Sequence, residues 1–143
     1  MPRSKAHKFI GTATGVVSAG GYGYFCQHDK GNAWQFALGG ALGGYATSRL
    51  ADILEPSQSL GPNHRGIFHG IALNGTVVAS SYDSAKQWLQ TLVDKANNLD
   101  NTSKHLEAFI YRLMVGFLIG AFAGHTSHLL ADLTTPGGLP LLA

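Results

Sequence analysis

The sequence predicts an all-α protein: a compact, glycine-rich bundle of four apolar helices and one amphipathic helix, associated with a membrane. Of the 143 residues, 45% are hydrophobic and only 13% are charged, whereas an ordinary soluble domain has roughly 25% charged residues. Most of the 19 glycines lie inside apolar segments. No stretch alternates polar and apolar residues with the period of a strand. The length suits one domain, residues 1–143.

The glycines predict how the helices pack. Glycine inside a helix costs about 1 kcal/mol relative to alanine, so a close contact must offset that cost. Several glycines are four residues apart and therefore share a helix face. They are Gly11 and Gly15, Gly39 and Gly43, Gly40 and Gly44, and Gly116, Gly120 and Gly124. This spacing lets helix backbones approach closely, as is common for helices in lipid.

Four apolar segments of helical length follow one another along the chain. The first, residues 9–26, is expected to be retained as a helix, because its glycine-rich sequence is unlike the apolar region of a cleaved signal peptide. The second, residues 33–54, is expected to end before Pro56. The third covers residues 67–82, and the fourth and most hydrophobic covers residues 108–131. Polar residues interrupt them, so none has the ~20 consecutive apolar residues of an unambiguous membrane span.

Between the third and fourth segments, residues 83–107 are polar, yet Trp88, Leu92, Ala96 and Leu99 recur at helical spacing. This pattern predicts an amphipathic helix. Its apolar stripe can pack on the bundle. Alternatively, the helix lies in the membrane interface with Trp88 at the depth of the lipid headgroups.

Charge and cysteine content exclude some classes of function. The net charge is +2 with no run of lysine or arginine, so nucleic acid is not expected as a partner. The single cysteine, Cys26, excludes an internal disulfide and a multi-cysteine zinc site. The seven histidines are therefore the main candidates for metal ligands.

The strongest candidate ligands lie in the fourth apolar segment. On a helix, His128 and Asp132 stand one turn apart on the same face, and His125 lies one turn before His128. An imidazole nitrogen with a carboxylate oxygen suits zinc, manganese or iron. The alternative is a core histidine hydrogen-bonded to an aspartate. A carboxylate in an apolar helix is costly without a partner, which favours the metal.

Two further groups of candidates surround the loop after the second segment. His64 and His69 are five residues apart, so we expect His64 on the loop and His69 on the following helix. Arg65 is placed to bind a phosphate or carboxylate through its planar fork, unless it is simply a surface arginine. Asp52 and Glu55 offer a metal ligand and a general base. Their alternative is a pair of solvated acids at a helix end.

Three histidines remain. His7, just before the first apolar segment, is a plausible further ligand contributed by the start of the chain. His28 and His105 lie in polar connections and are expected to be solvated.

At these residues the chain resembles the YdjM-like family of bacterial inner-membrane-associated proteins, described as LexA-binding, metal-dependent hydrolases. The matching features are His7 before a glycine-rich helix, Asp52 followed by Pro56, the HRGxxH string from His64 to His69, and GHTSHLLADLTTPGG from Gly124 to Gly138. They cover most of the chain except residues 83–107, which look like a variable insertion.

The resemblance implies a polar site among the helices that binds one or two divalent ions, most readily zinc or manganese. The residues it implicates are His7, Asp52, His64, His69, His128 and Asp132. Where the family has a Pro-Asp-x-Asp run, this chain has Ala51-Asp52-Ile53-Leu54, so Glu55 is the remaining candidate for a second acid. A LexA-type regulator is an expected partner by resemblance only.

The expected activity is hydrolysis of an ester or phosphoester, with membrane lipid as a partner and a small or lipid-derived molecule as the substrate. Asp52 or Glu55 would accept a proton from the activated water, and Arg65 would steady the developing negative charge. The basic N-terminus is expected on the cytoplasmic side of the inner membrane. The alternative is a non-enzymatic membrane protein whose histidines and aspartates hold a structural metal or a hydrogen-bond network serving a partner interaction.

Overall fold

The computed structural model describes residues 2–48, 50, 53 and 71–133, and all regular secondary structure in these ranges is helical. The elements are α1 (Pro2–Gly21), the short π-helix η1 (Tyr22–Cys26), α2 (Ala33–Thr47), α5 (Ile71–Asn101) and α6 (His105–Leu133). The predicted all-α class is therefore confirmed for the described part of the chain.

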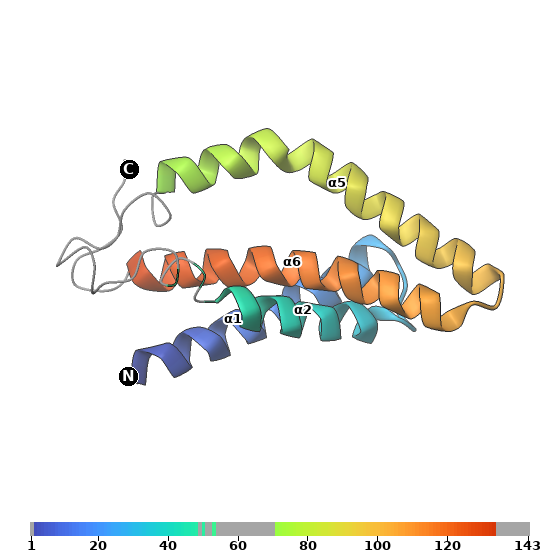
Figure 1. The fold of residues 1–143 in the computed structure, drawn as a ribbon, viewed down its shortest axis with the longest axis horizontal. Coiled ribbons are helices and arrows are strands. Elements are labelled where there is room, and N and C mark those ends of the chain that lie inside the picture. Colours follow the sequence, from blue (N-terminus) through green and yellow to red (C-terminus); the bar gives the residue numbers. More distant parts are fainter. Residues whose placement is uncertain (1, 49, 51–52, 54–70, 134–143) are drawn as a thin grey trace.

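Helices α1, α2 and α6 pack side by side as a three-helix bundle, and α5 lies along one flank (Figure 1). A tight turn connects α5 to α6, which run in opposite directions. In this turn Ser103 has a positive φ of 59°, and the amide of Lys104 donates to the carbonyl of Leu99 at 2.9 Å. The N-terminus of α1 and the C-terminal end of α6 lie at the same end of the bundle (Figure 1).

Glycine contacts hold the three helices together. A Cβ added at Gly15 would overlap the backbone of Gly40. A Cβ at Gly120 would lie 2.5 Å from the Cα of Gly40, and one at Gly124 would lie 2.7 Å from the Cα of Gly44. The face of α2 that carries Gly40 and Gly44 therefore touches both neighbouring helices at backbone distance. This confirms the packing that the four-residue spacing predicts.

The buried core lies toward the end of the bundle where α5 joins α6. It contains Ala19 of α1, Phe36 of α2, Val93 of α5 and Val115 of α6. At the same end α1 widens into η1, and Gly23 makes room for the ring of Phe36, which would lie 2.6 Å from an added Cβ. Helix α5 is thus fixed to the bundle by its second half.

The boundary between the third and fourth predicted segments differs from the expectation. From Ile71 onward, the third apolar segment and the polar segment that follows it form one continuous helix, α5, which ends at Asn101. The next helix begins at His105 rather than at residue 108. No proline or glycine follows Gly75 within α5, so nothing local stops the helix where its composition changes.

The apolar stripe of α5 packs on the bundle, but not with all of the predicted residues. Ala96 is fully buried and Leu92 is partly buried, whereas Trp88 is 53% exposed. Leu89 and Val93 complete the packed face instead. The packed face is therefore rotated slightly from the predicted one, which turns Trp88 outward.

Many large apolar side chains face outward from the three-helix bundle. The most exposed on each helix are Phe9 and Val17 of α1, Trp34 and Tyr45 of α2, and Leu106 and Leu130 of α6. Among the described residues, one helix, spanning His105–Ala131, is long and apolar enough to cross a membrane by length and composition.

Candidate metal site

His7 and His128 meet at the end of the bundle where α1 begins and α6 ends. Their Nδ1 atoms lie 3.1 Å apart, and their ring centroids are 4.5 Å apart with an interplanar angle of 63°. His128 is only 1% exposed, and His7 is partly buried. Two residues separated by 121 positions in the sequence are thus in direct contact.

The glycine register explains why these two histidines meet. One layer of the bundle contains Gly11 of α1, Gly44 of α2 and Gly124 of α6, whose backbones are in close contact. His7 lies four residues before Gly11, and His128 lies four residues after Gly124. Because four residues are about one helical turn, both histidines belong to the next layer along the bundle. Backbone contact in one layer therefore brings the two side chains together in the next.

Ser48, which directly follows α2, belongs to this histidine layer, since it lies four residues after Gly44. It is fully buried, and its hydroxyl donates to the carbonyl of Tyr45 at 3.0 Å. A Cβ at Gly11 would lie 2.5 Å from the Cβ of Ser48, which places Ser48 against α1. Sequence reasoning missed Ser48, although it continues the spacing of Gly40 and Gly44.

Facing imidazole nitrogens limit what this pair can do. Two Nδ1 atoms at 3.1 Å cannot both carry a proton, so at least one presents a lone pair to the other. The pair can share one proton in a hydrogen bond, or both lone pairs can be directed at one cation. The arrangement is therefore able to hold a proton or a metal ion between α1 and α6.

Hydroxyl groups and one cation surround the histidine layer. Thr14 donates to Ser127 across the α1–α6 contact at 3.2 Å, and Ser127 donates to the carbonyl of Gly124 at 2.9 Å. Lys8 donates to the hydroxyl of Tyr45 at 3.1 Å, with its ammonium 4.8 Å from the centre of that ring. These polar contacts tie α1 to both neighbouring helices next to His7.

Several predicted site residues lie outside the described residues. They are Asp52, Glu55, His64, Arg65 and His69, together with the side chain of Asp132. His125 lies on α6 one turn before His128 and is half-buried. Among the side chains that the structure describes, no three from histidine, cysteine, aspartate or glutamate form a group that could hold a metal. The structure thus brings together His7 and His128 of the predicted set.

His28 and His105, predicted to be solvated, are both exposed. His105 nevertheless takes part in a charged network at the opposite end of the bundle, 2.9 Å from a carboxylate oxygen of Asp100. The centre of this network is Arg112, which is 3% exposed and lies 2.6 Å from Asp100 and 3.1 Å from Asp29. It also donates to the side chain of Asn97 at 3.0 Å. The network joins α5, α6 and the loop between α1 and α2.

The charged network predicts a specific acid sensitivity. The hydrogen bond from His105, followed by the ion pair with Arg112, holds the pKa of Asp100 below its ordinary value of 3.8. A lowered carboxyl pKa stabilises the fold above the ordinary value, and this stabilisation is lost as the pH falls through the lower pKa of the folded state. We therefore expect the melting temperature of the wild type to approach that of Asp100→Asn below about pH 4.

Thermal denaturation followed by circular dichroism from about pH 6 to pH 3 checks this expectation. Asp94→Asn is the matched control, because Asp94 is exposed on the same helix and accepts a hydrogen bond only from Gln90 among the contacts of the described residues. A gap between wild type and Asp100→Asn that stays constant across this range would contradict the assignment.

Comparison of the chain with models of protein families, with curated proteins and with solved structures gave no match.

Proposed function

We propose that this chain is a membrane-associated protein that binds a divalent metal ion with His7 and His128, and that it is a metal-dependent hydrolase. The observation that carries the metal proposal is the contact between these two histidines. Their Nδ1 atoms are 3.1 Å apart at the end of a bundle whose glycine register leads both residues to the same layer.

The donor atoms fit a tetrahedral metal ion. Zinc–nitrogen bonds are about 2.0–2.1 Å long, so two nitrogens on a tetrahedral ion are about 3.3–3.4 Å apart. The observed 3.1 Å is within a few tenths of this value. Two acids continue the same four-residue spacing in the sequence. Asp52 follows Ser48 by four residues, and Asp132 follows His128 by four. A set of imidazoles and carboxylates suits zinc or manganese.

A divalent cation at this position supplies Lewis acidity, which lets water act as a nucleophile near neutral pH. The roles proposed for the chain's own residues follow from their chemistry. His7 and His128 hold the ion from α1 and α6. Asp52 or Glu55 accepts a proton, and Arg65 neutralises charge that develops on an ester or phosphoester. An apolar setting favours a lipid-derived substrate.

The distribution of charge supports membrane association. No aspartate, glutamate, lysine or arginine occurs in residues 9–28, 31–48 or 113–131. These stretches of 18 to 20 residues would be about 27–30 Å long as helices, close to the ~30 Å hydrocarbon core of a bilayer. They coincide with the three glycine-packed helices, whose outward side chains are largely apolar. The basic N-terminus favours a cytoplasmic location for the end that carries His7.

Helix α5 differs from the other three in its outward residues. Ser84, Lys86, Gln87 and Asp94 are all exposed, and exposed charges are costly in lipid. We therefore assign lipid contact to the outer faces of α1, α2 and α6, and contact with water to the outer face of residues 84–94 of α5.

Cysteine labelling tests this division. Cys26→Ala removes the only cysteine, after which Leu42→Cys on α2 and Gln87→Cys on α5 each introduce one exposed thiol. In vesicles with a charged maleimide on both sides, Leu42→Cys should react at least about tenfold more slowly, because the reactive thiolate does not form in hydrocarbon. Equal labelling rates of the folded variants would contradict the assignment of α2 to lipid.

Hydrolysis is tested with the protein in vesicles and p-nitrophenyl esters and phosphodiesters as probes. A chelator should abolish turnover, and added zinc or manganese should restore it. His128→Ala should retain less than about 1% of the wild-type rate, whereas His28→Asn, at the opposite end of the bundle, should match the wild type. Bound metal without turnover of any probe would contradict the hydrolase assignment and favour a structural metal in a non-enzymatic membrane protein.

A further inference from the structure

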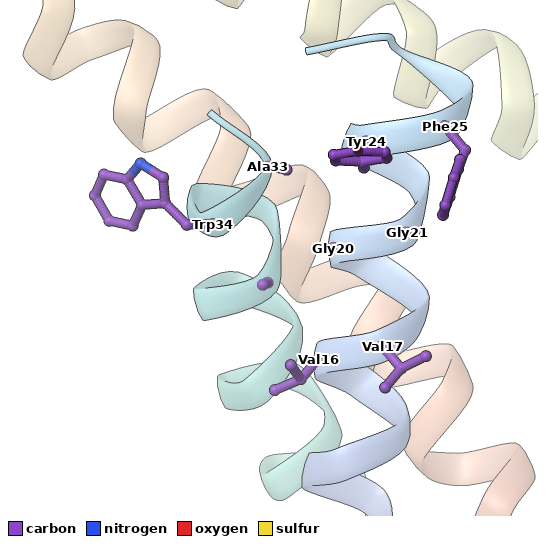
Figure 2. A pocket seen from close by; sticks show the side chains of 9 residues that line it. Val16, Val17, Gly20, Gly21, Tyr24, Phe25, Ala33 and Trp34 are labelled. Carbon is purple, nitrogen blue, oxygen red and sulfur yellow. The ribbon is translucent and has the colours of Figure 1, made fainter. Parts of the chain in front are cut away.

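An open apolar groove runs along the outer surface between α1 and α2, near the end of the bundle that carries Lys30. Its volume is about 650 Å³. Small residues form much of its surface, including Gly20, Gly21 and Ala37, while Trp34 and Tyr24 border it (Figure 2). Helix α6 lies behind α1 and α2 in this view, so the groove faces away from it (Figure 2).

The π-helix shapes one end of the groove. In η1 the rings of Tyr24 and Phe25 stand edge to face with their centroids 4.8 Å apart, and both line the groove. Gly21 leaves the groove open, because a Cβ added there would meet no atom within 4 Å. This opening next to two aromatic rings can accept an aliphatic chain.

The length of the groove matches one leaflet of a bilayer. Its lining extends from Val16 of α1 to Phe25 of η1, and the nine steps between these residues rise by about 13 Å along a helix axis. Half of a ~30 Å hydrocarbon core is about 15 Å. Because Lys30 lies just beyond the aromatic end, the groove runs from one membrane surface toward the middle of the bilayer.

A cation stands at the aromatic end of the groove. The Lys30 ammonium lies 5.3 Å from the centre of the Tyr24 ring. The neighbouring acid, Asp29, pairs with Arg112 at 3.1 Å and accepts hydrogen bonds from Asn32. Asp29 therefore does not neutralise Lys30, which is exposed and forms no ion pair in the described part of the chain. A positive charge at the end of an apolar groove complements a phosphate that carries a hydrocarbon chain.

We propose that the groove binds one anionic phospholipid, with an acyl chain along Gly20 and Gly21 and the phosphate at Lys30. The inference rests on the membrane association proposed above, and it is independent of the metal. A second copy of this chain or a helix of another protein would compete for the same small-residue surface.

The test is native mass spectrometry of protein released from nanodiscs that contain equal amounts of palmitoyl-oleoyl phosphatidylglycerol and phosphatidylcholine. The wild type should retain one phosphatidylglycerol. Gly21→Leu adds a side chain to the groove at a position where a Cβ meets no atom within 4 Å, and it should lower retention about tenfold. Ala13→Leu adds apolar volume on the exposed face of the same helix, outside the groove, and should retain lipid like the wild type. Lys30→Gln should lower the preference for phosphatidylglycerol about fivefold.

Three outcomes would overturn the proposal: equal retention by wild type and Gly21→Leu, an unchanged lipid preference in Lys30→Gln, or a dimer that Gly21→Leu dissociates while lipid retention is unchanged. Flotation with vesicles separates this failure from failure of the proposed function. Wild-type protein that does not float contradicts the membrane association itself. Floating protein with unchanged lipid retention in Gly21→Leu contradicts only the groove.

Discussion

Replacing Gly40 with leucine is expected to disassemble the three-helix bundle. A Cβ at this position would overlap the carbonyl of Gly15 and lie 2.6 Å from the Cβ of Ala19 on α1. On the other side, Gly120 of α6 approaches the Cα of Gly40 so closely that its own added Cβ would lie at 2.5 Å. Neither neighbour is the flexible end of a side chain, so the helices themselves must separate.

The expected loss of folding free energy is large compared with the stability of the whole fold. Overpacking a core by a methylene costs about 1–3 kcal/mol, and a small domain is stable by only about 5–15 kcal/mol. Gly40→Ala should therefore lose several degrees in melting temperature, and Gly40→Leu should lose cooperative unfolding altogether. Gly21→Ala is the matched control, because its Cβ meets nothing and it gains about 0.5–1 kcal/mol of helix propensity.

Circular dichroism during heating in detergent measures all three variants. We expect Gly40→Ala to melt below the wild type and Gly21→Ala to melt at or above it. A Gly40→Leu variant that melts like the wild type would mean that α2 does not lie between α1 and α6 at backbone distance.

Alanine at His7 or at His128 is expected to lower metal affinity by at least about 100-fold, because loss of a direct ligand exceeds the 10–100-fold cost of losing an outer-shell partner. The double variant should lose less than the product of the two single losses, since two ligands of one ion are energetically coupled. Their separation of 3.1 Å is the reason to expect one shared ion.

Competition titration with a zinc indicator measures these affinities. His28→Asn provides the control, because His28 is exposed, lies at the other end of the bundle and has a positive φ of 53° that asparagine tolerates. Multiplicative losses in the double variant would indicate that the two histidines bind separate ions or that neither is a direct ligand.

The features that were predictable from the sequence depend on the four-residue spacing of a helix turn. This spacing relates Gly11 to Gly15 and Gly40 to Gly44. Because glycine inside a helix is costly unless a close contact offsets the cost, the spacing predicts close helix contacts without any knowledge of topology. The candidacy of His7 and His128 as ligands was also predictable from residue type and position. The structure places these two side chains in contact, and their role as metal ligands stays a prediction.

Other features depend on tertiary contacts that leave no local pattern. The π-helix at Tyr22–Cys26 fits around the ring of Phe36, a partner on another helix. Arg112 is one of the polar residues that interrupt the apolar segments, and the sequence does not show that it pairs with acids from α5 and from the α1–α2 loop. Helix α5 is one continuous element, although its composition changes from apolar to polar along its length. The change in composition therefore suggested a helix boundary at a point where the backbone hydrogen bonding is continuous.

The proposed function depends on one divalent ion that is bound between His7 and His128. Elemental analysis of protein purified without chelator tests it most directly, with wild type beside His128→Ala. We expect about one zinc or manganese ion per wild-type chain, and its loss from His128→Ala that remains helical by circular dichroism. Folded wild type without metal, or full metal content in His128→Ala, would contradict the claim.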